Sequence, residues 1–186
     1  MNNTVVIYES KYGSAKSYAQ WIAAELSCPL FERKKFNPKD FEKYKVIIYG
    51  GGLYAGGLSG IKLIKENWNR LSSKKIILFT CGIADPANPE NISSIRTSLG
   101  KTLSPEMMSH IRFFHLRGCI DYSELSLIHK SMMAMLRRML LKKDTAGLTN
   151  EDRQLLATYG KRVDFINRDA ILPLVKYAVS LSDSGR

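Results

Sequence analysis

The residues of this chain best suited to hold an anion form the short turn that follows its first apolar run, Thr4–Tyr8. Apolar residues at helical spacing follow the turn, so it joins a predicted strand to a predicted helix. Gly13 permits a tight turn, and backbone N–H groups at the positive end of a helix attract negative charge. The turn therefore predicts a phosphate site made of Ser10, Lys11, Tyr12, Gly13, Ser14 and Ala15.

This turn is not the phosphate loop of nucleoside-triphosphate enzymes, because the pattern G-x-x-x-x-G-K-[ST] is absent from it. Many ordinary strand-to-helix turns also carry serine and glycine. The turn alone therefore does not decide between a phosphate site and a plain connection, and two further loops bear on the question.

The second loop is the glycine-rich stretch that follows the third apolar run. Glycine lets the backbone lie close to a flat ligand, and Tyr54, in the middle of the stretch, could stack on an aromatic ring. The alternative is a flexible turn with a tyrosine packed on the core. The candidate ligand-binding residues are Gly51, Gly52, Leu53, Tyr54, Ala55 and Gly56.

The third loop follows the fourth apolar run and ends near Pro86. Its backbone amides and carbonyls could form hydrogen bonds with the edge of a heteroaromatic ring, although the loop by itself favours a simple connection. The candidates here are Thr80, Cys81, Gly82 and Ile83.

Alternating apolar runs and helical stretches indicate an α/β fold with a parallel sheet covered on both faces. Five strands suit a doubly wound sheet of order 2-1-3-4-5, in which ligands bind beyond the carboxyl ends of the strands. The predicted strands are Thr4–Tyr8, Leu30–Arg33, Lys45–Tyr49, Lys75–Thr80 and Ile111–Leu116. The predicted helices between them are Ser14–Leu26, Ser59–Leu71 and Ile92–Leu99, with a break at Ser104-Pro105.

The chain continues for about 70 residues after the fifth strand, and we predict a single domain, 1–186, with an insertion at about 118–148. Leu125–Lys143 holds five Lys or Arg residues and no acid. This helix could pack on the domain, line the ligand site, or dock on a membrane or partner. Its apolar stripe is Leu125, Ile128, Met132, Met135, Leu136 and Met139. Two further helices, 150–166 and 170–181, are expected to cover the sheet.

The net charge of +11 favours anionic partners, although a basic surface can also serve solubility alone. Cys28, Cys81 and Cys119 lie far apart and fit no metal-ligand spacing, which predicts reduced, cytoplasmic thiols and no metal site. No stretch is apolar for the ~18 residues of a spanning helix.

Together the three loops resemble the flavodoxin family. Ser10, Tyr12 and Gly13 match its phosphate-loop pattern [ST]-x-[TY]-G-x-[TS], whereas Ala15 stands where the pattern has a hydroxyl. The stretch around Tyr54 looks like the family's G-x-x-x-Y-x-G loop. The resemblance implies a flavodoxin-like fold with FMN as cofactor, Tyr54 stacked on the isoalloxazine ring, and the third loop at its pyrimidine edge.

The segment after Leu116 is similar to the branch that contains menaquinone-dependent protoporphyrinogen IX dehydrogenases. That resemblance implies an FMN-dependent oxidoreductase that acts on a redox partner or a small molecule such as a porphyrinogen or a quinone. It also places Arg117, Asp121 and Tyr122 near the flavin as candidates for gating or substrate contact.

Other functions remain open. The chain could be a flavodoxin-type one-electron carrier, or a basic partner-binding module without flavin, since Ala15 departs from the pattern. Nucleic-acid binding has only the charge in its favour, because no sequence signature of a nucleic-acid-binding module is present. No nucleophile with a general base stands out, so no catalytic residue is assigned.

The positive charge leads to a prediction about the bound flavin. Positive surroundings stabilise the anionic reduced flavin. We expect the hydroquinone couple of the FMN-loaded protein to be less negative than in acidic flavodoxins. A spectroelectrochemical titration measures it, and a very low potential would contradict the prediction.

Overall fold

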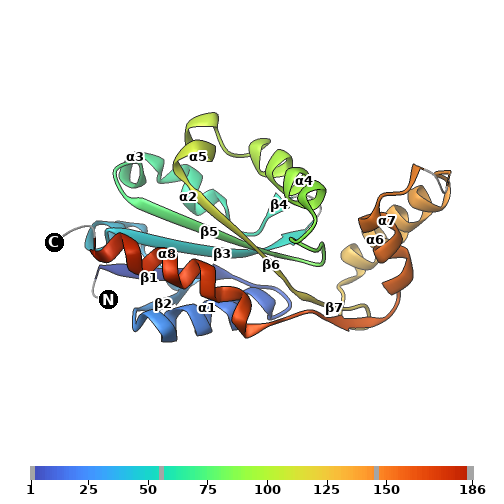
Figure 1. Ribbon diagram of the computed structural model, residues 1–186, viewed down its shortest axis with the longest axis horizontal. Coiled ribbons are helices and arrows are strands. Elements are labelled where there is room, and N and C mark those ends of the chain that lie inside the picture. Colours follow the sequence, from blue (N-terminus) through green and yellow to red (C-terminus); the bar gives the residue numbers. More distant parts are fainter. Residues whose placement is uncertain (1–2, 55–56, 145–146, 184–186) are drawn as a thin grey trace.

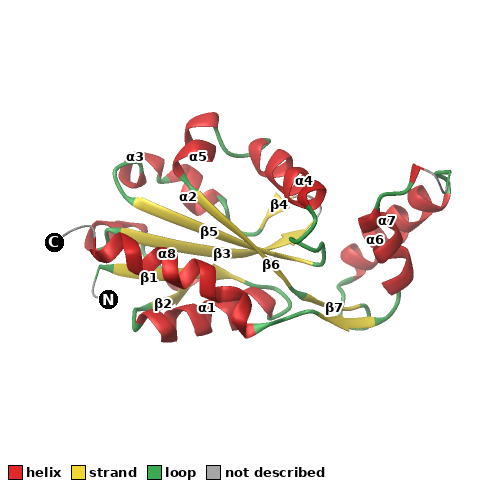
Figure 2. Ribbon diagram, in the orientation of Figure 1, coloured by secondary structure: helices red, strands yellow, loops and turns green. Residues whose placement is uncertain are grey.

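The computed structural model describes residues 3–54, 57–144 and 147–183. Its centre is a parallel sheet with helices on both faces (Figures 1 and 2). Within the described residues the order is β2-β1-β3-β5-β6, and β4 pairs with β3 in antiparallel fashion. The predicted doubly wound order is confirmed, with the hairpin strand β4 as an addition. The strands are β1 Thr4–Glu9, β2 Leu30–Glu32, β3 Val46–Tyr54, β4 Gly57–Leu58, β5 Lys75–Gly82 and β6 Arg112–Arg117.

Side chains alternate between the two faces of the sheet, and each face has its own apolar core. Val5 and Ile7 belong to one core and Val6 to the other, as period-two alternation requires. One face is covered by α1 Ser14–Leu26 and α8 Leu172–Asp183. The other is covered by α2 Lys62–Glu66, α3 Trp68–Leu71, α4 Pro89–Gly100 and α5 Pro105–His110.

The glycine run after the third apolar stretch is strand and not loop, which corrects the predicted boundary at Tyr49. Gly50, Gly51 and Gly52 pair with residues 79–81 of β5. A Cβ atom on Gly50 would lie 1.8 Å from Cζ of Phe79, so the missing side chain makes room for a buried ring. Glycine here serves packing inside the sheet.

The helix predicted over 59–71 is broken in two. The side-chain amide of Asn67 donates to the carbonyl of Leu63 (2.8 Å), and α2 ends just before Asn67 while α3 begins just after it. The Ser104-Pro105 break instead starts a helix that the sequence analysis missed. The Ser104 hydroxyl accepts from the N–H of Met107 (3.2 Å) and caps α5.

After β6 the chain leaves the sheet and forms what we call the arm, residues 119–164. The arm consists of the strand β7 Cys119–Asp121, the helices α6 Leu127–Leu141 and α7 Asn150–Thr158, and the strand β8 Arg162–Asp164. Strands β7 and β8 pair in antiparallel fashion, and α6 packs against α7. The helix predicted over 150–166 is therefore wrong beyond Thr158, and it covers α6 instead of the sheet. Gly160, with φ +79°, lies between α7 and β8.

The arm projects from the carboxyl end of the sheet (Figure 1) and is fastened where it leaves and rejoins the body. The N–H of Phe165 donates to the carbonyl of Gly118 (3.2 Å), and the Arg117 guanidinium lies 3.6 Å from the centre of the Phe165 ring. The Tyr18 hydroxyl of α1 donates to the carbonyl of Arg117 (2.7 Å) and accepts from the N–H of Asn167 (3.1 Å). One buried tyrosine thus holds both ends of the arm.

The chain rejoins the body through a 3-10 turn, Arg168–Ile171, and α8. Leu174 and Ala178 of α8 are fully buried against α1 and the sheet, so the predicted helix 170–181 is confirmed as a cover of that face. Among the described residues, no helix combines the length and the apolar character needed to cross a bilayer.

Gly50 offers a direct test of the packing inside β3. Replacing Gly50 by Ala places a methyl group inside the Phe79 ring, and we expect the free energy of unfolding to fall by about 3 kcal/mol or more. Gly57→Ala is the control, because its Cβ would meet only one atom, at 3.6 Å; we expect a change within about 0.5 kcal/mol. Urea unfolding measures both, and equal losses would contradict this account.

Candidate functional site

A cavity of about 390 Å³ lies at the carboxyl edge of the sheet, between the body and the arm. Such a volume is within the range of small-molecule and cofactor sites, ~300–1,000 Å³. All three predicted loops reach it, as parallel pairing requires. Their contributions are Tyr12, Ser14 and Ala15, then Gly52, Leu53 and Tyr54, then Cys81, Gly82 and Ile83.

Other predicted site residues do not line the cavity. Ser10, Lys11 and Gly13 belong to the first turn but stay outside the lining. Gly51 is buried in β3, where a Cβ would lie 2.7 Å from the carbonyl oxygen of Ser59. Thr80 is buried as well. Ala55 and Gly56 lie outside the described residues.

The beginning of α1 is open toward an anion. Gly13 takes φ +94°, a conformation that suits glycine, and no described side chain caps the helix. The first N–H groups of a helix have no intrahelical acceptor, and the helix dipole is positive there. Ser10 supports the turn from within, since its hydroxyl accepts from the N–H of Gly13 (3.1 Å).

The Ser14 hydroxyl forms hydrogen bonds with the arm. It accepts from the N–H of Cys119 (3.0 Å) and lies 3.3 Å from the Cys119 sulfur. Gly118 makes this approach possible, because a Cβ there would lie 3.0 Å from Ser14 Oγ. Of the predicted phosphate contacts, the backbone amides of α1 are therefore better placed than the Ser14 side chain.

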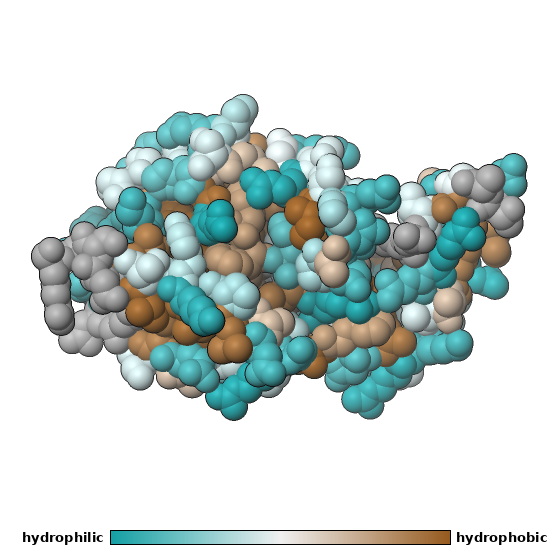
Figure 3. Space-filling model, viewed as in Figure 1, coloured by the Kyte–Doolittle hydropathy of each residue, from teal (hydrophilic) through white to brown (hydrophobic). Residues whose placement is uncertain are grey.

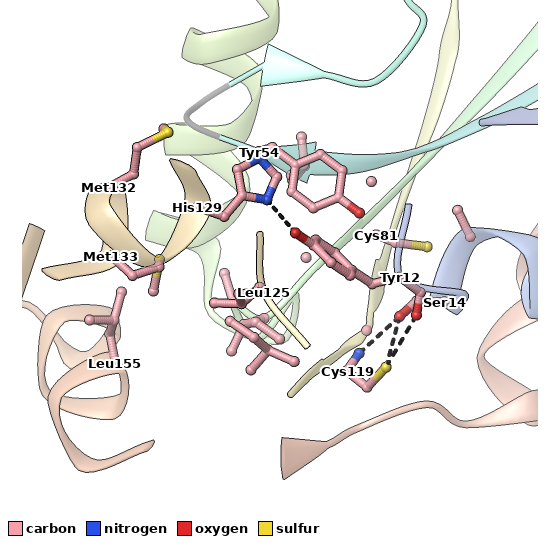
Figure 4. A pocket seen from close by; sticks show the side chains of 18 of the residues that line it. Tyr12, Ser14, Tyr54, Cys81, Cys119, Leu125, His129, Met132, Met133 and Leu155 are labelled. Atoms are coloured by element: carbon pink, nitrogen blue, oxygen red, sulfur yellow. Dashed lines mark hydrogen bonds between the residues drawn. The ribbon is translucent and has the colours of Figure 1, made fainter. Parts of the chain in front are cut away.

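An aromatic cluster of Tyr12, Tyr54 and His129 closes the cavity (Figure 4). The Tyr54 and His129 rings are stacked, with centroids 5.2 Å apart and planes at 23°. The Tyr12 hydroxyl and His129 Nδ1 share a hydrogen bond of 2.7 Å, and the Tyr12 ring meets the Tyr54 ring edge-on at 5.7 Å. Tyr54 was expected mid-loop, but it ends β3, and His129 of α6 already stacks on its ring.

The same contacts join α6 to the first turn. The Lys11 ammonium donates to Ser126 Oγ (3.2 Å), and the N–H of Ser126 donates to the Tyr12 hydroxyl (3.4 Å). Ser126 also caps α6, accepting from the N–H of His129 (3.4 Å). The predicted phosphate turn thus forms hydrogen bonds with the N-terminal cap of α6, the helix that forms the opposite wall of the cavity.

Burial shifts the pKa values of three side chains of the cavity in the direction that favours their neutral forms. Burial raises the pKa of Tyr54 to about 12, and burial, with the nearby Cys119, raises the pKa of the Cys81 thiol. Burial and then the positive charge of Lys11 lower the pKa of His129 below its usual value. Among the described residues, no group of three or more His, Cys, Asp or Glu side chains is arranged to hold a metal ion.

Most of the wall that the arm provides was not predicted from the sequence. Its stripe along Leu125–Lys143 divides between two surfaces: some members line the cavity, while Ile128, Met135 and Met139 are exposed. The apolar spacing signalled a helix with an adaptable surface but not which members face the cavity. The arm residues at the cavity include Ile120, Leu125, His129, Met132, Met133, Leu136 and Leu155 (labelled in part in Figure 4).

The three candidates for gating, Arg117, Asp121 and Tyr122, lie outside the cavity lining. Arg117 holds the third loop, donating to the carbonyl of Ile83 (3.3 Å) and lying 3.5 Å from the Asp85 carboxylate. Asp121 accepts from the N–H of Ser123 (2.9 Å), and the Tyr122 ring packs against another arm tyrosine. They shape the arm and the loop around the cavity.

The family model of the flavodoxin domain matches residues 5–146 of this chain. The chain therefore belongs to the flavodoxin domain family, and membership implies a flavin-binding redox protein. The match spans the sheet and extends into the arm through α6. It does not assign the chain to the protoporphyrinogen dehydrogenase branch.

Solved structures with a similar fold include flavodoxin 2 from Bacillus cereus, with 20% identity, a TM-score of 0.39, and coverage of 62% of this chain and 85% of that one. Flavodoxin 1 from the same organism has 17% identity, a TM-score of 0.41, and coverage of 61% and 83%. Rubredoxin oxygen:oxidoreductase from Desulfovibrio gigas has 11% identity, a TM-score of 0.40, and coverage of 97% and 37%. No curated protein matches the chain significantly.

Thr80 lies beside His115, a histidine whose burial makes the stability of the fold depend on pH. Thr80 Oγ1 and His115 Nδ1 share a hydrogen bond of 2.8 Å, and His115 Nε2 is buried without a partner among the described residues. Burial, and then the positive charge of Arg96, lower the pKa of His115 to about 4. Folding therefore keeps His115 neutral at pH values where an unfolded histidine would take up a proton.

Between pH ~6.5 and ~4 the unfolded chain binds a proton at this position that the folded protein does not. We therefore expect the free energy of unfolding to decrease as the pH is lowered through this window. His115 should contribute at most on the order of 3 kcal/mol to this decrease. His115→Asn, which keeps a hydrogen-bonding group near Thr80, should flatten the curve, whereas His110→Asn, at an exposed histidine, should not. Urea unfolding at several pH values decides, and equal slopes in all three proteins would contradict the assignment.

Proposed function

We propose that the chain binds FMN in the cavity between the sheet and the arm and works as an FMN-dependent oxidoreductase. The observation that carries the proposal is the continuity of the cavity: it runs from the uncapped start of α1, past Tyr54 and the third loop, to the apolar side chains of the arm. The start of a helix, an aromatic side chain and an apolar wall thus line one space.

The residues present fit the phosphate and the ring of FMN. The α1 amides and the helix dipole favour an anionic group near Ser14 and Ala15. Gly52 and Gly82 contribute backbone without side chains to the lining of the cavity, so a flat ring could lie close to the main chain there. Ala15 lacks the side-chain hydroxyl of the family pattern, but its substitution does not remove the backbone amides at the start of α1.

Bound FMN would supply the transfer of electrons. The chain would orient the cofactor, exclude water from it and provide groups that hold or transfer a proton. The arm shields the cavity from water with Met132, Met133 and Leu136. The Tyr12 hydroxyl and His129 Nδ1 form a hydrogen bond of 2.7 Å at the wall of the cavity. This pair can hold or pass a proton beside the site.

The arm favours an enzyme over a one-electron carrier. A carrier exposes its flavin to a docking protein, whereas here α6 and α7 enclose an apolar chamber beside the predicted ring site. Such a chamber suits an apolar small-molecule substrate, consistent with a dehydrogenase of the protoporphyrinogen dehydrogenase-like type acting on a porphyrinogen or linked to a quinone. Carrier function remains the second candidate, and rapid electron exchange with a redox protein but with no small molecule would favour it.

The first experiment is a visible absorption spectrum of the purified protein, taken before and after addition of FMN and desalting. Retained flavin absorbance is the expected result. Loss of all flavin after reconstitution would overturn the proposal and favour a partner-binding module without flavin.

Tyr54 and the start of α1 make separable contributions to flavin affinity. Removing the ring with Tyr54→Ala should weaken the binding of both FMN and riboflavin about tenfold or more, because stacking on an aromatic side chain contributes ~1–3 kcal/mol. The wild type and the variant should both prefer FMN to riboflavin, because the α1 amides bind only the phosphate.

Fluorescence titration measures these affinities, and Tyr177→Ala, on α8 away from the cavity, is the control. Equal affinity of the wild type for FMN and riboflavin would exclude α1 as the phosphate site. Unchanged affinity in Tyr54→Ala would exclude Tyr54 as a wall of the ring site.

A further inference from the structure

Helix α6 has two apolar surfaces, and only one of them has a role in the cavity. His129, Met132 and Leu136 face inward. Five of the seven most exposed large apolar side chains of the described residues lie on the remaining surface of this one helix: Leu127 (84% exposed), Ile128 (72%), Met135 (61%), Met139 (57%) and Leu141 (58%). A soluble domain rarely exposes so many large apolar side chains together.

The exposed apolar side chains form an ordered stripe. Ile128, Met135 and Met139 recur at positions i, i+7 and i+11, which places them on one side of a helix. Arg138 and Lys142 are exposed beside this stripe. We call Ile128, Met135, Met139, Arg138 and Lys142 together the outer face of α6.

Positive charge surrounds the outer face, and no acidic residue occurs from Leu125 to Lys143. Arg137 lies over the Tyr159 ring at 5.0 Å, and Lys130 donates to the carbonyl of Ser123 (3.0 Å), so these two cations are held at the flanks of the helix. At the end of the helix, Lys143 pairs with the carboxylate of Asp152 at 3.1 Å. The charge of the helix therefore matches an anionic surface.

The shape of the arm favours an extended surface as the partner. The arm projects beyond the body at one end of the molecule (Figure 3). The outer face is one side of a helix, with exposed Ile and Met side chains along it and exposed cations beside them. Helices of this composition lie in a lipid interface, with apolar side chains at the acyl boundary and Lys or Arg side chains at the headgroups.

We propose that the outer face of α6 docks on an anionic lipid surface. Ile128, Met135 and Met139 enter the acyl boundary, and Arg138 and Lys142 contact the headgroups. The opposite side of the same helix lines the cavity, so docking brings the cavity to the membrane surface. The proposal does not depend on flavin binding, because it rests on the surface of α6 alone.

The test is co-sedimentation of the full-length protein with two kinds of vesicle: phosphatidylcholine alone, and phosphatidylcholine mixed with phosphatidylglycerol. We expect binding to the anionic vesicles that weakens as salt is added, and little binding to the neutral ones. Absent binding to the anionic vesicles, or equal binding to both kinds, would overturn the proposal.

Matched variants locate the surface. Arg138→Glu with Lys142→Glu should lower the partition coefficient at least about tenfold, whereas the same charge change at exposed positions on the body, Lys34→Glu with Lys35→Glu, should have a smaller effect. Ile128→Ser with Met135→Ser and Met139→Ser should also abolish most binding. Leu172→Ser with Val179→Ser, at the exposed apolar positions of α8, is its control.

Two outcomes would assign the outer face to another partner and overturn the proposal. One is a dimer in solution that the Ile128, Met135 and Met139 substitutions convert to a monomer without a change in vesicle binding. The other is salt-sensitive binding to polyglutamate with no preference for anionic over neutral vesicles. Circular dichroism of each variant confirms that a loss of binding does not come from unfolding.

Discussion

The parallel pairing of β1 with both of its neighbours is the constraint on which the rest of the structure depends. Tyr8 pairs with Glu32 of β2 and with Gly50 of β3, so the three strands end at the same edge of the sheet. That edge is where α1 begins, where Tyr54 ends β3 and where the third loop leaves β5. The cavity residues of the three loops owe their places to the parallel alignment of these strands, and the arm closes the cavity over groups that already converge.

The strands and α1 could be predicted from the sequence because their signals are local. An apolar run and a helical period need no knowledge of the partner, and α1 has the predicted bounds, Ser14–Leu26. The glycine run of β3 was wrongly predicted as a loop for the opposite reason, since Gly50 accommodates the Phe79 ring of a neighbouring strand. Strands β7 and β8 were missed because each has three residues and pairs with a segment far away in sequence.

The candidate site could be predicted in part, for the same physical reason. Residues of the three loops were found because the fold rule brings the ends of parallel strands together. Their partners in the arm were not, because the contacts of Tyr12 with His129 and of Ser14 with Cys119 join residues more than 100 positions apart. The period of α6 predicted a helix but could not divide its apolar residues between an inner and an outer surface, since both carry methionine and leucine.

The hydrogen bond between Gly118 and Phe165 has an evolutionary consequence. It joins the residue before the arm to the residue after it, and Tyr18 secures both crossings from α1. A chain could therefore pass almost directly from β6 toward α8 without moving any strand of the sheet. The arm can have been acquired, enlarged or exchanged in single genetic steps, so that the sheet could diversify its chemistry while its own packing stayed under unchanged selection.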